Sequence, residues 1–340
     1  MSDLDRDGLS RWMVAQLGES ARVRRIERLT EGQSNPTYKI TTEERDLVLR
    51  RKPFGKLLPS AHAVDREFRL LSALKPGDFP VPTPLALCSD DSVIGAMFYV
   101  MELVEGRNIA NGQLPDIEAE HRKSYYTSMV EAMVQLHSIN PFSVGLGDFG
   151  RHENYLPRQL ERWSKQYRLS EAKPSEDMEK LVTGLPRKIP EQYRTSILHG
   201  DFRIDNVIFS PTSGQIAAVL DWELATLGDP LADFAYFALA WLLPADGRFA
   251  IGGLDLAEFG LPSLEQACEA YCELSGSNVA ASLNWYFAFN LFKLASIIQG
   301  IRKRIDDGNA SSEQASQIVA KQSCILEIAV RHARLARVID

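Results

Sequence analysis

The sequence predicts an α+β fold in which a small strand-rich part precedes a larger, mainly helical part, with a cleft between the two. In residues 1–104, short apolar runs such as 46–51 and 97–104 are separated by turn-forming residues. In residues 105–340, apolar residues recur three or four positions apart over long segments. Strands and helices that are segregated along a chain are typical of α+β proteins. We therefore expect an N-lobe of residues 1–104 and a C-lobe of residues 105–340.

The first part is expected to contain several strands and one helix. The expected strands cover residues 23–29, 37–41, 46–51 and 97–104. A helix is expected over residues 60–74, because Phe68, Leu71 and Leu74 fall on one face at a spacing of three. The prolines in residues 76–84 must end it, since proline cannot continue a helix.

The second part is expected to be helical apart from one hairpin. The expected helices cover residues 117–139, 155–169, 176–185, 231–243, 264–274, 280–305 and 311–339. Two short apolar runs, 207–209 and 216–220, flank the segment Pro-Thr-Ser-Gly at 211–214. This composition is typical of a turn and predicts a β-hairpin.

Composition excludes several classes of protein. The 38 basic and 45 acidic residues give a net charge of −7, which argues against a general nucleic-acid-binding protein. Four cysteines in 340 residues are too few for a disulfide scaffold and form no CxxC pair. The polar N-terminus and the polar residues within the longest uncharged stretch, 274–292, predict neither a leader peptide nor a membrane span. We expect a cytoplasmic protein.

The strongest motif is His-Gly-Asp-Phe-Arg-Ile-Asp-Asn at residues 199–206, followed after the hairpin by Leu-Asp-Trp at 220–222. Phosphoryl transfer needs Mg²⁺ on the phosphates, a carboxylate to orient the acceptor hydroxyl and nearby positive charge. Asp201 can accept the proton of that hydroxyl. The amide oxygen of Asn206 and the carboxylate of Asp221 are hard oxygen ligands that suit Mg²⁺. Four fixed letters at this spacing are rare by chance.

This pattern resembles the aminoglycoside phosphotransferase and choline kinase-like family. The resemblance implies a protein-kinase-like two-lobed fold in which residues 199–206 form the catalytic loop. It implies that Asp201 is the catalytic base, that Asn206 and Asp221 hold the metal, and that Arg203 lies near the γ-phosphate. His199 is expected to hold the loop by packing, and Asp233 to cap or brace it.

A second stretch carries a more specific resemblance. Residues 49–62, Leu-Arg-Arg-Lys-Pro-Phe-Gly-Lys-Leu-Leu-Pro-Ser-Ala-His, and residues 65–68, Asp-Arg-Glu-Phe, are similar to the kinase-like domain fused to acyl-CoA dehydrogenase family members 10 and 11. That resemblance implies a hydroxyacyl-CoA as a possible acceptor.

The nucleotide site matches the family less closely. There is no GxGxxG, and the turn-rich loop that contains Gly32, Ser34 and Asn35 stands where the phosphate-covering hairpin is expected. Its backbone N–H groups can still face phosphates, although a simple hairpin turn remains the alternative. Glu102 and Val104 stand where the family holds adenine through a backbone carbonyl and an N–H.

Arginine replaces the usual strand lysine. Arg50 ends the run Leu-Val-Leu, and a guanidinium can hold phosphate oxygens in a bidentate manner. Glu67, on the next expected helix, would be its ion-pair partner. Arg51 or Lys52 would be the phosphate ligand if the register of the strand at residues 46–51 differs by one or two residues. The alternative for Arg50 is a solvated charge at the edge of the sheet.

Together these features predict a Mg²⁺-dependent kinase that uses ATP as the donor. Only seven residues separate Asp221 from Asp229, which leaves no room for a peptide-binding activation segment. The predicted acceptor is therefore a small hydroxylated molecule. Residues 274–305 contain no acid, which favours a neutral or anionic acceptor over a polycation. The alternative is a catalytically inactive kinase-fold protein that binds nucleotide.

Overall fold

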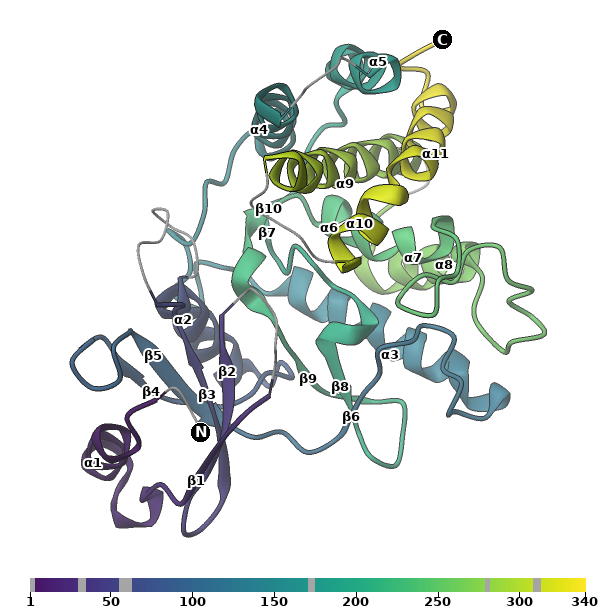
Figure 1. The fold of residues 1–340 in the computed structure, drawn as a ribbon. Coiled ribbons are helices and arrows are strands. Elements are labelled where there is room, and N and C mark those ends of the chain that lie inside the picture. Colours follow the sequence, from purple (N-terminus) through teal and green to yellow (C-terminus); the bar gives the residue numbers. More distant parts are fainter. Residues whose placement is uncertain (1–3, 30–34, 55–62, 171–174, 279–281, 308–312) are drawn as a thin grey trace. The chain divides into compact units, whose positions relative to one another are not determined.

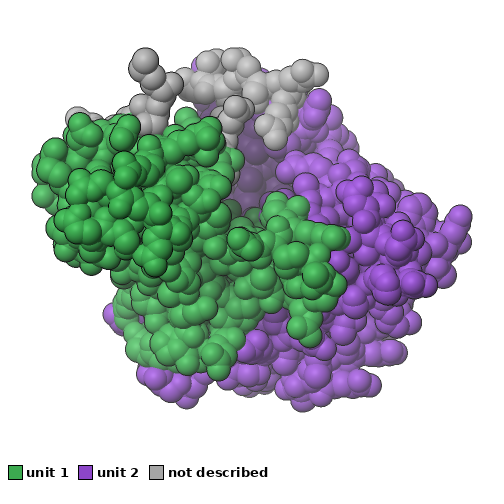
Figure 2. Space-filling view, turned by 90° about the horizontal axis from the view of Figure 1, so that it is seen from below, with its two compact units in different colours: residues 1–108, 144–146, 206–225 green, residues 109–143, 147–205, 226–340 purple. Residues whose placement is uncertain are grey.

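A computed structural model describes residues 4–29, 35–54, 63–170, 175–278, 282–307 and 313–340. The chain divides into two compact units, which Figure 2 colours separately. Unit 1 comprises Met1–Asn108, Val144–Leu146 and Asn206–Ala225. Unit 2 comprises Ile109–Ser143, Gly147–Asp205 and Thr226–Asp340. The main sheet lies in unit 1 and most helices lie in unit 2, so the expected α+β class is confirmed. The lobe boundary at residue 104 stays a prediction.

Unit 1 is built on a five-stranded antiparallel sheet in the order β1-β2-β3-β5-β4 (Figure 1). Its strands are β1 (Arg25–Arg28), β2 (Thr37–Thr41), β3 (Asp46–Arg51), β4 (Pro84–Cys88) and β5 (Phe98–Glu102). Strand β4 was not among the expected strands. It lies at the edge of the sheet, where Pro84 costs no ladder hydrogen bond.

Two helices cover this sheet. Helix α1 (Arg6–Leu17), which was also not expected, packs Leu9 and Met13 into one core cluster with Leu47 and Leu49 of β3. Side chains alternate along a strand, so the residues between these leucines face the opposite side. There lies helix α2 (Val64–Leu74), which agrees with the expected helix over its described residues. The alternation therefore directs Arg50 towards α2 and Arg51 away from it.

The expected hairpin also belongs to unit 1. Strand β8 (Val207–Phe209) pairs with β9 (Ile216–Val219), and β6 (Arg107–Asn108) pairs with β8 on its other side. At the open end, the Leu220 N–H donates to the Asn206 carbonyl at 2.8 Å. The hairpin therefore brings residue 206 and the segment that begins at residue 220 to the same end of unit 1.

Unit 2 is mainly helical. Its helices are α3 (Ala119–Ser138), α4 (Tyr155–Ser170), α5 (Glu176–Gly184), α6 (Pro230–Phe237), α7 (Leu239–Leu242), α8 (Leu264–Ser275), α9 (Leu283–Asp306), α10 (Glu313–Ala320) and α11 (Gln322–Leu335). Helix α9 packs against α4, α6 and α11 (Figure 1). The single helix expected over 311–339 is two helices, α10 and α11, and 231–243 likewise divides into α6 and α7. Among the residues that the structure describes, no helix is long and apolar enough to cross a membrane.

Candidate active site

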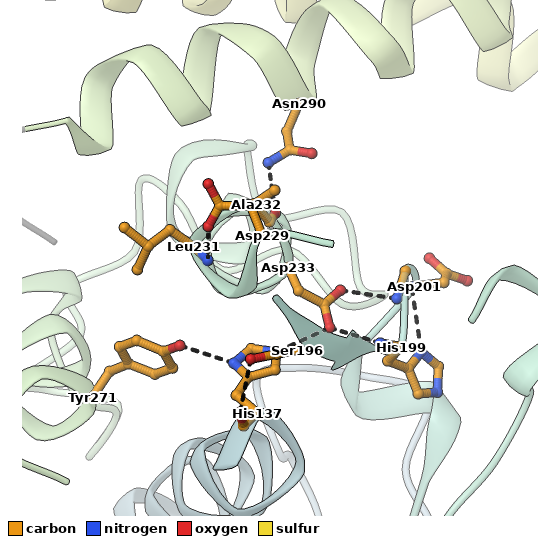
Figure 3. A network of polar contacts seen from close by, with 11 residues as sticks. His137, Ser196, His199, Asp201, Asp229, Leu231, Ala232, Asp233, Tyr271 and Asn290 are labelled. Carbon is orange, nitrogen blue, oxygen red and sulfur yellow. Dashed lines mark hydrogen bonds and ion pairs between the residues drawn. The ribbon is translucent and has the colours of Figure 1, made fainter. Parts of the chain in front are cut away.

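The predicted catalytic loop follows the short strand β7 (Ser196–Leu198), which pairs with β10 (Thr226–Gly228) in unit 2. Gly200 has a φ of +85°, a left-handed conformation that glycine adopts without steric cost. The Asp201 N–H donates to Nδ1 of His199 at 3.2 Å, so His199 holds the loop from within, as expected (Figure 3). His199 itself is fully buried.

Asp233, on α6, holds the same loop from outside (Figure 3). Its carboxylate accepts the N–H groups of His199 at 2.7 Å and Gly200 at 2.8 Å. His137 Nε2 lies 3.3 Å from the same carboxylate, and His137 Nδ1 lies 2.8 Å from the Tyr271 hydroxyl. Burial alone would raise the pKa of Asp233, but hydrogen bonding and charge from His137 outweigh burial and lower it. A charged Asp233 therefore braces the loop.

Tyr236 and Arg203, both in unit 2, lie close to the Asp201 carboxylate. The Tyr236 hydroxyl donates to its Oδ1 at 2.7 Å, and Arg203 Nε lies 3.5 Å from the same oxygen. Arg203 also donates through Nη2 to Asp205 at 3.1 Å, and its guanidinium stacks 5.0 Å from the centroid of the Phe249 ring. The structure therefore brings together the two residues predicted for catalysis, Asp201 and Arg203.

Sequence reasoning missed Tyr236. It lies three residues after Asp233 on α6, and residues at that spacing share one face of a helix. Since Asp233 was already expected to brace the loop, this spacing was a signal that could have identified Tyr236.

Within unit 1, Arg50 joins three acidic side chains. Its Nη1 lies 3.0 Å from Glu67 Oε1, and its Nη2 lies 2.6 Å from Asp221 Oδ1 and 3.9 Å from Glu223 Oε2. Arg50 is largely buried, and burial favours a lower pKa. The neighbouring acids, Glu67 first, outweigh this and raise the pKa of Arg50. Burial raises the pKa of Glu67, and the charge of Arg50 opposes that shift.

The two alternatives to Arg50 lie elsewhere. Arg51 donates through Nη2 to the Tyr38 hydroxyl at 3.1 Å and covers the Phe54 ring at 3.7 Å from its centroid. Lys52 pairs with Asp65 at 3.2 Å. Arg50 is thus the member of this trio that reaches Glu67 and Asp221, as the alternation along β3 requires.

The residues predicted for the metal share the open end of the β8–β9 hairpin. Asp221 has a φ of +62°, an uncommon conformation for a residue other than glycine. Such strain clusters at functional sites. The donor set fits Mg²⁺, which takes one or two carboxylate or amide oxygens and completes its shell with phosphates and water. In the described part of the chain, no group of three or more His, Cys, Asp or Glu residues could hold a metal ion without such help.

The remaining predicted nucleotide residues are only partly described. Gly32 and Ser34 lie outside the described residues, and Asn35 is buried just before β2. Glu102 ends β5, where its N–H donates to the Thr83 carbonyl at 2.9 Å and its side chain pairs with Arg45. Val104 follows two residues later.

Unit 2 also contains an apolar cavity of about 520 Å³. Tyr236 and Arg203 form part of its wall, which otherwise consists mainly of aliphatic side chains. The lining residues are Arg203, Tyr236, Leu239, Leu243, Pro244, Ala245, Asp246, Arg248, Phe249, Ala250, Leu294, Ile297, Ile298, Ile301, Ile318, Ala320, Lys321, Cys324 and Ile325. The cavity therefore adjoins Tyr236 and Arg203, which contact the Asp201 carboxylate.

Residues 25–267 match the sequence profile of the phosphotransferase enzyme family. The chain belongs to the phosphotransferase enzyme family. The family that residues 199–206 and 220–222 predicted is therefore confirmed. This match covers most of the chain, including Arg50 with its acidic partners and the loop that carries Asp201.

Mouse acyl-CoA dehydrogenase family member 10 is a relative of this phosphotransferase, with 43% identity over 317 residues. The matched region covers 92% of this chain and 30% of the relative. Human acyl-CoA dehydrogenase family member 11 is 40% identical over 286 residues, covering 84% of this chain and 37% of the relative. The chain thus spans about a third of the length of these curated relatives.

Solved structures extend this family relationship to the fold. A Ralstonia eutropha JMP134 protein, provisionally described as an aminoglycoside phosphotransferase, is 39% identical with a TM-score of 0.89, covering 98% of this chain and 99% of that one. A thermostable mutant of aminoglycoside phosphotransferase APH(4)-Ia, in ternary complex with AMP-PNP and hygromycin B, is 16% identical with a TM-score of 0.61, covering 96% of this chain and 98% of that one. These structures confirm the expected kinase-like fold.

Proposed function

We propose that this phosphotransferase family member is a small-molecule kinase that moves the γ-phosphoryl group of ATP to an acceptor hydroxyl. The observation that carries the proposal is that the Asp201 N–H donates to His199 while the Asp201 carboxylate accepts from the Tyr236 hydroxyl, so separate partners hold its backbone and its side chain. A base fixed in this way suits a reaction in which positioning supplies most of the catalysis.

The residues divide the reaction between them. Asp201 accepts the proton of the acceptor hydroxyl. At the same time the oxygen of that hydroxyl bonds to the γ-phosphorus, and the bond from the γ-phosphorus to the β-phosphate oxygen breaks. Arg203 supplies positive charge beside Asp201. Asn206 and Asp221 would hold Mg²⁺, which neutralises charge on the phosphates when bound.

In this proposal the nucleotide is bound mainly by unit 1. Arg50, held by Glu67, would bind phosphate oxygens, and its guanidinium remains charged at every relevant pH. The loop of Gly32, Ser34 and Asn35 would cover the phosphates. AMP-PNP in the APH(4)-Ia complex supports ATP as the donor.

The cavity of unit 2 favours an acceptor with an apolar chain. Among the described residues that line it, Asp246 is the one acid, and Lys321 pairs with it at 2.5 Å. A desolvated polycation needs paired carboxylates, so this wall disfavours an aminoglycoside or choline. The names of the acyl-CoA dehydrogenase relatives favour the same reading. A hydroxyacyl thioester is the leading candidate.

A direct comparison of acceptors tests this function. The measurement is kcat/KM of the full chain with ATP and Mg²⁺ for kanamycin, choline and 4-hydroxyacyl-CoA thioesters of increasing chain length. We expect turnover of the thioesters that rises with chain length, and little turnover of the cations. Efficient turnover of either cation with none of the thioesters would refute the acceptor assignment. Nucleotide binding without turnover of any acceptor in a wider panel of hydroxylated metabolites would favour the inactive alternative.

A further inference from the structure

Tyr236 links the Asp201 carboxylate to the wall of the apolar cavity. Its hydroxyl donates to Asp201 Oδ1 at 2.7 Å, and its side chain lines the cavity of about 520 Å³. On the same face of α6, Asp233 holds the backbone of the loop at residues 199–200. One helical face therefore fixes both the backbone that precedes Asp201 and the Asp201 carboxylate.

Helix α9 in turn holds this face of α6. Tyr286 donates to Asp229 at 2.7 Å, and Asn290 donates through Nδ2 to the Ala232 carbonyl at 2.9 Å. The ammonium of Lys293 lies 4.9 Å from the centroid of the Tyr236 ring. Positions 286, 290 and 293 are four and three residues apart, so they lie on one face of α9. The position of Tyr236 is therefore set by packing that does not involve Asp201.

The surroundings of this pair favour a protonated phenol. Burial, followed by the charge of Asp201, raises the pKa of Tyr236 well above its usual value, so the phenol remains a donor. Arg203 faces Asp201 from the loop, with Asp205 on its other side, and Lys293 faces the ring from α9. Asp233 accepts the N–H groups of residues 199 and 200, and His199 accepts the N–H of Asp201.

We propose that Tyr236 is a positioning residue for phosphoryl transfer, which holds the Asp201 carboxylate at the cavity wall. An acceptor whose chain occupies the cavity then presents its hydroxyl to that carboxylate. The proposal rests on the proposed function, in which Asp201 is the base. Tyr236 acts through Asp201, because its phenol fixes the rotation of the carboxylate that accepts the proton.

The test is Tyr236→Phe, which removes one oxygen atom and keeps the ring in the cavity wall. Hydrogen bonds to charged groups predict a fall in kcat of about 10- to 100-fold, with the acceptor KM and the nucleotide Kd little changed. The matched control is Tyr126→Phe, which removes a buried hydroxyl that donates to the Gly112 carbonyl at 2.7 Å in the same unit. We expect that control to keep the parent kcat.

A second measurement does not depend on turnover. Carboxyl-¹³C aspartate NMR of the full chain reports the surroundings of the Asp201 carboxylate, whose signal is assigned by its loss in Asp201→Asn. We expect Tyr236→Phe, but not Tyr126→Phe, to change the chemical shift of Asp201. An unchanged Asp201 signal and an unchanged kcat in a folded Tyr236→Phe variant overturn the proposal. A changed Asp201 signal in a protein that phosphorylates no acceptor supports the contact and refutes the proposed function instead.

Discussion

Arg50 and Asp221 form an ion pair at 2.6 Å within unit 1. The residue proposed to bind phosphate is therefore bonded to a residue proposed to bind the metal. In the proposed kinase, phosphates would compete with Asp221 for the guanidinium, and Mg²⁺ would compete with Arg50 for the carboxylate. Glu67, which also contacts Arg50, would keep the guanidinium in place during this exchange. We therefore expect metal and nucleotide binding to be coupled.

Arg50→Lys should weaken nucleotide binding. An ammonium lacks the fork that lets Arg50 contact Glu67 and Asp221 through separate nitrogens, so we expect the nucleotide Kd to rise by about tenfold. Isothermal titration with AMP-PNP measures this. Lys52→Met, which removes the partner of Asp65, is the control and should leave the Kd unchanged. The reverse pattern would mean that Lys52 is the phosphate ligand.

Asp221→Ala should abolish turnover, because the metal loses its carboxylate ligand and the transferred group loses its charge compensation. Steady-state assays at increasing Mg²⁺ measure this, together with the parent protein in excess chelator. Activity of the variant at the parent level, or of the parent in chelator, would contradict the metal assignment.

Asp201→Asn should lower kcat by about a hundredfold or more, since an amide cannot accept the hydroxyl proton. Nucleotide affinity should be spared, because Asp201 is assigned to the acceptor. Paired measurements of kcat and of nucleotide Kd check both expectations. Lost nucleotide binding with intact chemistry would show that the roles of Asp201 and Asp221 are exchanged.

Asp233→Asn should lower both stability and kcat. The buried carboxylate accepts two backbone N–H groups, and an amide leaves one buried donor unmatched, which costs on the order of 2 kcal/mol. Urea unfolding gives the change in stability. Asp255→Asn, at an exposed carboxylate that accepts the Glu258 N–H, is the matched control and should have little effect. Equal effects of the two variants would remove the special role of Asp233.

His332 should make stability depend on acidity. The ring is largely buried on α11, and its Nδ1 lies 2.8 Å from Asn284 Oδ1. Burial, with a smaller effect from Arg331, lowers its pKa to about 4. The unfolded chain, with an ordinary histidine pKa near about 6.5, therefore binds a proton more readily than the folded one. This contribution to stability is present above that pH and is lost as the pH falls towards 4, at a cost on the order of 2 kcal/mol.

Urea unfolding between pH 7 and pH 4.5 measures the His332 effect. His332→Gln, which keeps a donor for Asn284, should lose this part of the pH dependence. His121→Gln, at an exposed histidine of α3, should retain it. A parent protein with the same pH dependence as His332→Gln would show that His332 titrates normally.

Local patterns predicted much of this molecule. The alternation along β3 explains why Arg50 meets Glu67 while Arg51 does not, and turn composition predicted the β8–β9 hairpin. Strand β4 was missed because Pro84 reads as a break, and only the sheet order reveals an edge position that tolerates it. The break near Lys321 that separates α10 from α11 has no proline or glycine to mark it. The Tyr236 contact with Asp201 depends on tertiary packing, although its helical spacing from Asp233 was visible.

Unit 1 is assembled from three stretches of chain, and one of its boundaries falls between Asp205 and Asn206, inside the motif at 199–206. In evolutionary terms, this unit is not a module that a single recombination event can exchange. Replacing residues 1–108 alone would bring in a new sheet, whereas the hairpin between Asn206 and Asp221 would still be encoded by the original gene. A crossover at residue 206 would separate the codon for Asp201 from that for Asn206. The two units are therefore expected to be inherited together and to diversify mainly by point substitution.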